Sequence, residues 1–186
     1  GTAPVTVATS VRYYLSPDAD ISTGDLYLGQ RAIAGLAVGA SSTASTTLSL
    51  PNNLAPGPYY IGAYADATYL VSESNDGNNS RATGAPVAFR PDLVLSAFTG
   101  AISAGKVSIS DTFSNQGNAA TVGTFHVYYY LSTDAIPGGS DLYLGNRART
   151  SALNAGASKG TTTLFTVPAA PPPGEYYLIG WVDPAN

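Results

Sequence analysis

The chain has 186 residues, a formal net charge of −4, no Cys and only 8 Lys and Arg. The lack of Cys excludes disulfide bonds, thiolate metal sites and a Cys nucleophile, and the lack of a basic field argues against nucleic acid and anionic membranes as partners. The longest uncharged apolar run, residues 32–40, is far shorter than the roughly 20 residues that span a bilayer, so no membrane insertion is expected here.

Alternating residues predict β-strands along the whole chain. Thr, Val and Tyr favour strands, Gly and Pro punctuate turns, and long helical faces are missing. In chain order, the predicted strands cover residues 5–13, 44–50, 59–65, 82–90, 93–95, 107–113, 125–131 and 176–182. Turns are predicted at residues 52–53, 76–77, 115–117 and 138–139. The fold class is therefore all-β, with sandwiches of about seven short strands.

The chain also repeats itself. Residues 13–19 recur as residues 129–135, a shift of 116, and 13 of the 20 positions from Tyr13 to Ala32 are identical in the two copies. A one-residue insertion then moves the shift to 117. A period of this length matches one sandwich domain.

Two domains are expected from this repeat, residues 1–90 and residues 91–186. Gly1 aligns with Gly117, so the first copy is expected to lack its opening strands. Asn186 aligns with Tyr69, so the second copy is expected to lack its closing strands. Because there is no initial Met and no signal-peptide pattern, we expect a processed product or a piece of a longer protein.

Short motifs recur around these strands, and together they resemble the CARDB family, the cell adhesion related domain found in bacteria. The motifs that carry the resemblance are residues 71–75, 78–79, 91–94, 104–105, 115–117, 130–134, 144–145, 155–158 and 174–177. The resemblance implies tandem immunoglobulin- or fibronectin-III-like β-sandwiches in a secreted or cell-surface protein. It also implies an extracellular role in cell adhesion.

An acidic loop is the one candidate metal site. Asp18, Asp20 and Asp25 place three carboxylates within eight residues, and Ca²⁺ prefers such oxygen ligands. The second copy keeps two of them, as Asp134 and Asp141, which makes a weaker calcium candidate. The alternative is turn chemistry, because Asp side chains also bind their own backbone in turns. Calcium is the only cofactor that the sequence suggests.

Two other motifs have simpler explanations. Residues 73–79 are expected to form a hairpin in which Asp76 and Gly77 adopt positive φ, although Asn78 also fits a glycosylation acceptor. Residues 156–160 have the G-x-S-x-G spelling of a hydrolase elbow, but strands flank them and His126, the only His, lies upstream. We therefore predict no catalytic residues and no enzyme.

Adjacent tyrosines, as in Tyr13-Tyr14 and residues 128–130, must point to opposite faces of a strand. One of each group should enter the core, and the other should pack on the exposed sheet, on a neighbouring domain or on a sugar. The leading function is a structural and adhesive repeat, with neighbouring repeats or subunits as partners and a filament joined by strand exchange as one form. The alternative is a carbohydrate-binding module of a secreted hydrolase, with surface polysaccharide as partner.

Overall fold

A computed structural model describes residues 2–167 and 171–183 of the chain, and it is built from antiparallel β-strands. The helical part of the described residues is a single 3-10 turn, Asp76–Asn78. The predicted all-β, immunoglobulin-like fold class is therefore confirmed. Among the described residues, no helix has the length and apolar character that crossing a membrane requires.

The strands divide into two compact units. The first unit contains Gly1–Pro51 and Gly57–Phe89, and the second contains Asn52–Pro56 and Arg90–Asn186. The short segment 52–56 therefore groups with the second unit, where the Leu54 carbonyl accepts a hydrogen bond from the N–H of Ala120 at 2.8 Å. The division expected from the sequence, into residues 1–90 and 91–186, places segment 52–56 in the first domain instead.

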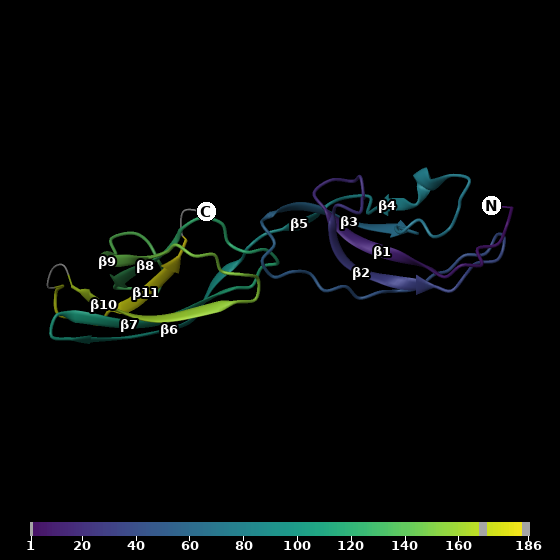
Figure 1. The fold of residues 1–186 in the computed structure, drawn as a ribbon. Helices are drawn as coiled ribbons and strands as arrows, with labels where there is room; N and C mark the ends of the chain where they lie inside the picture. The colour runs from purple at the N-terminus through teal and green to yellow at the C-terminus, as the bar shows by residue number, and fades with distance from the viewer. Residues whose placement is uncertain (1, 168–170, 184–186) are drawn as a thin grey trace. The chain divides into compact units, whose positions relative to one another are not determined.

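The first unit is a single sheet. Its strands are β1 (Thr9–Ser16), β2 (Leu26–Ile33), β3 (Gly57–Ala65), β4 (Ser80–Ala82) and β5 (Val87–Phe89). The order is β2-β1-β3-β4, and β5 also pairs with β3 (Figure 1). No second sheet is present among the described residues of this unit.

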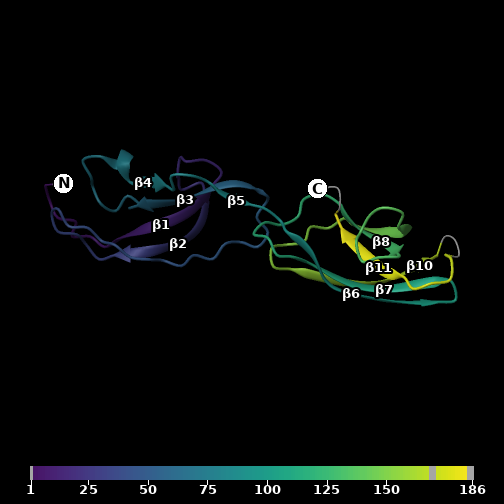
Figure 2. The ribbon, with the colours of Figure 1, turned by 180° about the vertical axis from the view of Figure 1, so that it is seen from behind.

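The second unit is a two-layered sandwich. Its strands are β6 (Leu93–Ser103), β7 (Lys106–Asn115), β8 (Phe125–Ser132), β9 (Leu142–Arg149), β10 (Ser158–Thr166) and β11 (Tyr177–Val182). One layer has the order β10-β7-β6 and the other β11-β8-β9. Figure 2 shows this unit from behind, with β6 and β7 below β8 and β11. Glycines allow close approach between the layers, because a Cβ on Gly180 would lie 2.7 Å from Phe98 and one on Gly100 would lie 2.3 Å from Leu178.

The core of the second unit lies between these layers. Alternate residues of β7 and β8 point inward and lose nearly all their exposure. The buried cluster consists of Val107, Ile109, Phe113, Phe125, Val127, Tyr129, Leu131, Leu144 and Leu153. Burial of this apolar surface is the main force that joins the two sheets.

The two copies share one strand register. Tyr13 pairs with Gly29 on β2, and the register then shifts before Tyr14. Tyr129 pairs with Gly145 on β9, and the same shift follows. Strands β2-β1-β3 of the first unit therefore correspond to β9-β8-β11 of the second. We call the face that carries Tyr129 the inner face, and we use the same term for the face that carries Tyr13.

The predicted strand at residues 44–50 is wrong, although its alternating pattern is clear. Residues 41–50 form no strand, whereas their counterparts in the second unit form β10 and pair with β7. A strand needs a neighbour to satisfy its backbone N–H and C=O groups. The described residues of the first unit contain no counterpart of β6 or β7, so this segment has no strand there to pair with.

Candidate functional site

Three polar side chains meet on the inner face of the second unit. Asp111 comes from β7, Tyr129 from β8 and Arg147 from β9. The Tyr129 hydroxyl and the Arg147 guanidinium both donate hydrogen bonds to the Asp111 carboxylate, and Arg147 Nε donates to Tyr129 Oη at 3.3 Å. The guanidinium carbon also lies 5.3 Å from the ring centroid of Phe113. We call Asp111, Tyr129 and Arg147 the acid–Tyr–Arg cluster.

This cluster links the two sheets electrostatically. Asp111 is 3% exposed and Tyr129 is 0% exposed, and a buried carboxylate is costly unless it is paired and hydrogen-bonded. Burial, reinforced by the hydrogen bond to Asp111, raises the pKa of Tyr129 to about 12. The phenol therefore stays protonated at neutral pH and continues to donate to the carboxylate.

Sequence analysis missed the acid–Tyr–Arg cluster, although a signal was present. Asp111 has the same parity along β7 as Val107, Ile109 and Phe113, all of which are buried. An acid at an inward position of an apolar strand needs a cationic or hydrogen-bonding partner. That requirement pointed to an inward Arg on a facing strand, such as Arg147.

The described part of the first unit has the Tyr and the Arg of this cluster but not the acid. Tyr13 and Arg31 are the counterparts of Tyr129 and Arg147, and the counterpart of Asp111 would lie on a strand that is not among the described strands of this unit. Tyr13 Oη instead hydrogen-bonds with Thr46 Oγ1 at 3.3 Å. This bond, assisted by nearby Arg31, lowers the pKa of Tyr13 below its usual value.

Arg31 itself is incompletely satisfied. Its Nη1 donates to the Ser42 hydroxyl at 2.8 Å and its Nη2 donates to the Ser42 carbonyl at 3.2 Å. Its Nε is buried and has no hydrogen-bond partner among the described residues. Among the described residues, no carboxylate therefore forms an ion pair with this cation on the inner face of the first unit.

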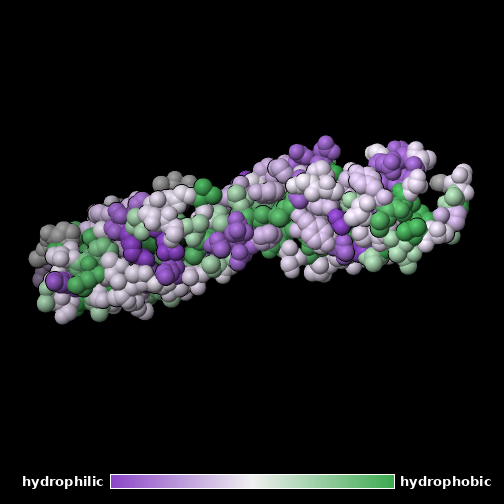
Figure 3. Space-filling view, viewed as in Figure 1, coloured by the Kyte–Doolittle hydropathy of each residue, from purple (hydrophilic) through white to green (hydrophobic). Residues whose placement is uncertain are grey.

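Side chains on the same face are also less buried in the first unit. Phe125 and Val127 are buried in the second unit, but their counterparts Thr9 and Val11 are only half-buried. The register is the same, and no second sheet covers this face among the described residues of the first unit. Hydrophobic residues reach the surface of the first unit (Figure 3), and Val7 and Val38 are about half exposed, at 49% and 55%.

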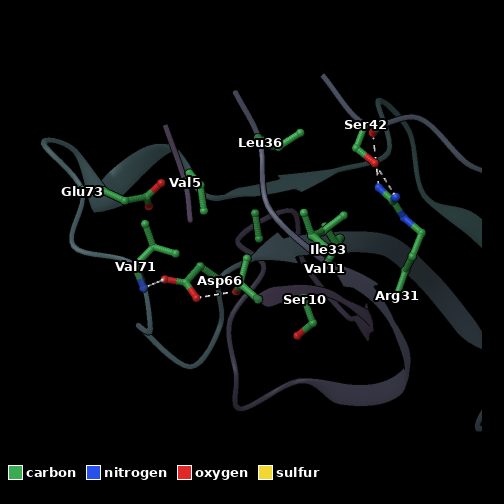
Figure 4. A pocket seen from close by; sticks show the side chains of 12 residues that line it. Val5, Ser10, Val11, Arg31, Ile33, Leu36, Ser42, Asp66, Val71 and Glu73 are labelled. Atoms are coloured by element: carbon green, nitrogen blue, oxygen red, sulfur yellow. Dashed lines mark hydrogen bonds between the residues drawn. The ribbon is translucent and has the colours of Figure 1, made fainter. Parts of the chain in front are cut away.

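A cavity of about 160 Å³ opens at the end of this inner face. Its lining includes Val11, Ile33 and Leu36 together with Arg31 and Asp66. Figure 4 shows the apolar side chains of Val11 and Ile33 between Arg31 on one side and Asp66 on the other. The cavity is thus apolar in the middle and has opposite charges at its ends.

The Asp66 carboxylate organises the loop beside this cavity. It accepts hydrogen bonds from the Thr9 hydroxyl at 2.6 Å and from the N–H groups of Leu70 and Val71 at 3.1 and 2.8 Å. Burial opposes ionisation, but these three donors outweigh it and lower the pKa of Asp66. Its backbone has a φ of 48°, and the counterpart Asp183 has a φ of 45°.

Each acidic loop uses its carboxylates within its own turn. Asp18 accepts from the N–H of Asp20 at 2.9 Å, and Asp25 accepts from the N–H of Ser22 at 2.7 Å. Asp134 and Asp141 do the same for the N–H groups of residues 136 and 138. Among the described residues, no three acidic or His side chains gather as a metal site would require.

Calcium binding at these loops stays a prediction of the sequence. The geometry supports the alternative interpretation, in which Asp side chains stabilise turns. The first loop also has a packing role, because Ile21 lies against Gly62 of β3, where a Cβ would come within 2.2 Å. A rise in melting temperature at millimolar Ca²⁺ would support binding, and an unchanged melting temperature would remove the hypothesis.

The tyrosines alternate across the sheets. In the second unit Tyr129 enters the core, and Tyr128 and Tyr130 lie on the outer face. Their ring centroids lie 6.4 and 5.5 Å from that of Tyr143. Trp181 of β11 pairs with Tyr128 of β8. In the first unit the order differs, since Tyr14 is the buried residue and Tyr13 is half-buried.

Two of the other sequence motifs can now be assigned. Residues 73–79 do not form the predicted hairpin with positive φ at Asp76 and Gly77. They contain the 3-10 turn, in which the Asn75 side chain accepts from the N–H of Gly77 at 3.0 Å. Ser158, the Ser of the G-x-S-x-G spelling, begins β10, so the motif lies on a loop before a strand.

The match found among known protein families falls within the first unit. The CARDB family model matches residues 1–83, which include β1 to β4 and the acidic loop. No curated protein matches the chain. Residues 1–83 of this chain are therefore similar to the CARDB family, whose domain suggests a bacterial module related to cell adhesion.

Proposed function

We propose that this chain is a non-enzymatic structural and adhesive repeat of a secreted or cell-surface bacterial protein. In this role, the single sheet of the first unit is completed by β-strands from a neighbouring repeat or subunit. The observation that carries the proposal is the difference between two sheets of equal register. One has a covering layer of β6, β7 and β10, and the other has none among the described residues.

Completion would stabilise the first unit in two ways. It would bury half-exposed apolar side chains of the inner face, at roughly 25 cal/mol for each Å² removed from water. It would also give residues 41–50 a strand to pair with, as β10 pairs with β7. Addition of strands to an open sheet is an established mode of protein association.

The added strands can come from two sources, and in both cases they pair with the same open sheet. They come either from the same polypeptide, in a longer array of repeats, or from another subunit, in a filament joined by strand exchange. The intact mass of native material separates the two. A mass well above 19.0 kDa assigns the strands to the same polypeptide, because that is the mass of this chain alone.

Hydrogen exchange on the native material tests the proposal itself. Complementation predicts that the amides of residues 41–49 exchange as slowly as those of β10, because both are then held in a sheet. The same segment should exchange rapidly in the isolated 186-residue chain. Rapid exchange in the native material as well would show that nothing completes the sheet.

The outer face of the second unit favours a second candidate, which is carbohydrate binding. Tyr128, Tyr130, Tyr143 and Trp181 gather there on three adjacent strands, and Tyr143 and Trp181 are 42% and 39% exposed. Exposed aromatic rings offer flat apolar surfaces on which sugar rings can stack. Retention on polysaccharide beads, lost in Tyr143→Ala, would support this role. Tyr27→Ala changes the equivalent Tyr of the first unit and serves as the matched control.

A further inference from the structure

We infer that the open sheet of the first unit selects a β-hairpin that presents a carboxylate between Tyr13 and Arg31. This inference rests on the proposed function and names its partner, which is a hairpin of the kind formed by β6 and β7. The partner's defining chemistry is an acid at the position that Asp111 holds in the second unit.

The register between the copies places the acid. In the second unit Asp111 of β7 pairs with Thr161 of β10. The counterpart of Thr161 is Ala44, so an incoming strand in the same register sets its acid opposite Ala44. Its side chain then points to the inner face, where Tyr13 and Arg31 occupy the positions of Tyr129 and Arg147.

The polar groups already on this face explain why an acid is selected. Closure would bury the Arg31 guanidinium, whose Nε already has no partner among the described residues. A buried cation without a counter-charge is strongly unfavourable, whereas a carboxylate gives it both a counter-charge and an acceptor. The Tyr13 hydroxyl then has the same acceptor that Tyr129 has in the second unit.

The shape of the inner face adds two further conditions for the partner. Gly180 has Ala63 as its counterpart, and a Cβ on Gly180 would lie 2.7 Å from Phe98 and 2.8 Å from Leu95. Because Ala63 carries a Cβ, a hairpin that fits the first unit needs a smaller side chain than Phe at the position of Phe98. In the second unit, a Cβ on Gly100 would come within 2.3 Å of Leu178. The counterpart of Leu178 in the first unit is Ile61, so the partner hairpin also needs a glycine at the position of Gly100.

The partner is a hairpin of the same repeat type and not an unrelated peptide. The β6–β7 hairpin already covers the equivalent inner face in this chain, and the two faces share strand order and register. A peptide of residues 91–116 is therefore the probe. It carries Asp111, Phe98 and Gly100, and a Phe98→Leu version removes the bulk that faces Ala63.

The experiment titrates this peptide, in its Phe98→Leu form, into the full 186-residue chain and measures affinity and amide exchange. Binding should protect residues 41–49, which shows that the first unit is the site and not β10 of the second. The Asp111→Asn change in the peptide should weaken binding about 100-fold or more, since it leaves Arg31 buried without a counter-charge. Arg31→Met in the chain should weaken binding to a similar degree.

Coupling between the two changes tests the direct pairing. In the Arg31→Met chain, the Asp111→Asn peptide should bind no more weakly than the Asp111 peptide. Arg12→Met is the matched control, because Arg12 lies on β1 with the opposite parity and should not affect affinity. A second readout joins residues 91–116 ahead of Gly1, where the Asp111 version should melt at a higher temperature than the Asp111→Asn version.

The outcomes separate the inference from the proposed function. Equal binding of the Asp111 and Asp111→Asn peptides, with residues 41–49 protected, would leave strand complementation intact and overturn the selection of an acid. If neither peptide binds and the joined hairpin leaves residues 41–49 unprotected, strand complementation itself is wrong. Protection of β10 alone would assign the peptide to the second unit and overturn both.

Discussion

The hydroxyl of Tyr129 donates a hydrogen bond to the carboxylate of Asp111 inside the sandwich of the second unit. This bond joins a strand of one sheet to a strand of the other, and Arg147 completes the charge balance. The equivalent Tyr13 of the first unit has no such acid on its inner face.

Removal of the acid should destabilise the second unit. Asp111→Ala leaves the Arg147 guanidinium and the Tyr129 hydroxyl without their acceptor, and loss of one partner of a buried ion pair typically costs about 3 to 5 kcal/mol. Denaturation followed by the fluorescence of Trp181, the only Trp of the chain, measures this change because Trp181 lies on β11. Asp134→Ala, in an exposed loop, is the control and should change stability far less.

High pH should weaken the second unit through Tyr129. Its pKa in the folded unit is about 12, above the usual value of about 10, so the protonated phenol is favoured by folding. The resulting stability is fully present below pH 10 and is lost as pH rises toward 12. Tyr129→Phe should lower the free energy of unfolding at neutral pH but should show a smaller decline between pH 10 and 12. An identical decline in both proteins would contradict this assignment.

Buried Asn115 should be as important as a core residue. Its amide donates to the carbonyls of Ala119 and Leu153 at 2.7 and 2.9 Å, and its Oδ1 accepts from the N–H groups of Asp92 and Gly117 at 3.0 and 3.1 Å. Asn115→Ala leaves these buried groups unsatisfied and should cost about 2 to 4 kcal/mol. Chemical denaturation measures the loss.

The control for this change is another Asn of the same unit. Asn146→Ala removes an exposed side chain whose amide donates a hydrogen bond to the Tyr143 hydroxyl. Its effect should stay within about 0.5 kcal/mol, as is usual for surface substitutions. Equal losses in the two variants would contradict a special role for Asn115.

Acid should open the loop that Asp66 holds in the first unit. Because hydrogen bonds lower the pKa of Asp66 in the folded unit, its contribution to stability is present above about pH 4, the unfolded value, and is lost as pH falls through the folded pKa. Faster amide exchange at Leu70 and Val71 in acid would report this opening. Asp66→Asn can keep the positive φ but removes the charge, so its exchange there should be fast already at neutral pH.

Sequence analysis predicted most of the fold. Tyr13 and Tyr129 were placed in equivalent strands, and the structure gives both the same pairing with a glycine and the same register shift. Strands β2 and β9 were not predicted, because residues 26–33 and 142–149 mix charged and small residues instead of alternating regularly. Residues 44–50 alternate clearly but form no strand. An alternating sequence shows which side chains would share a face, but it does not show whether a neighbouring strand is there to pair with.

The candidate site was likewise predicted in part from the sequence. The acidic residues of the loop at Asp18 were found from local composition, and the structure shows the carboxylates of Asp18 and Asp25 accepting hydrogen bonds within the loop. The acid–Tyr–Arg cluster was missed, because Asp111 and Arg147 lie 36 positions apart and only strand pairing and sheet packing bring them together.

The sequence by itself determined the all-β class, the internal repeat and the strand faces, because these depend on alternation and turn residues that are local along the chain. Only the tertiary structure decided which inner face is covered, which acid meets which Arg and which strand has a partner. Those relationships depend on contacts between residues distant in sequence. The same inward Tyr is therefore buried beside a carboxylate in one unit and half-buried beside Thr46 in the other.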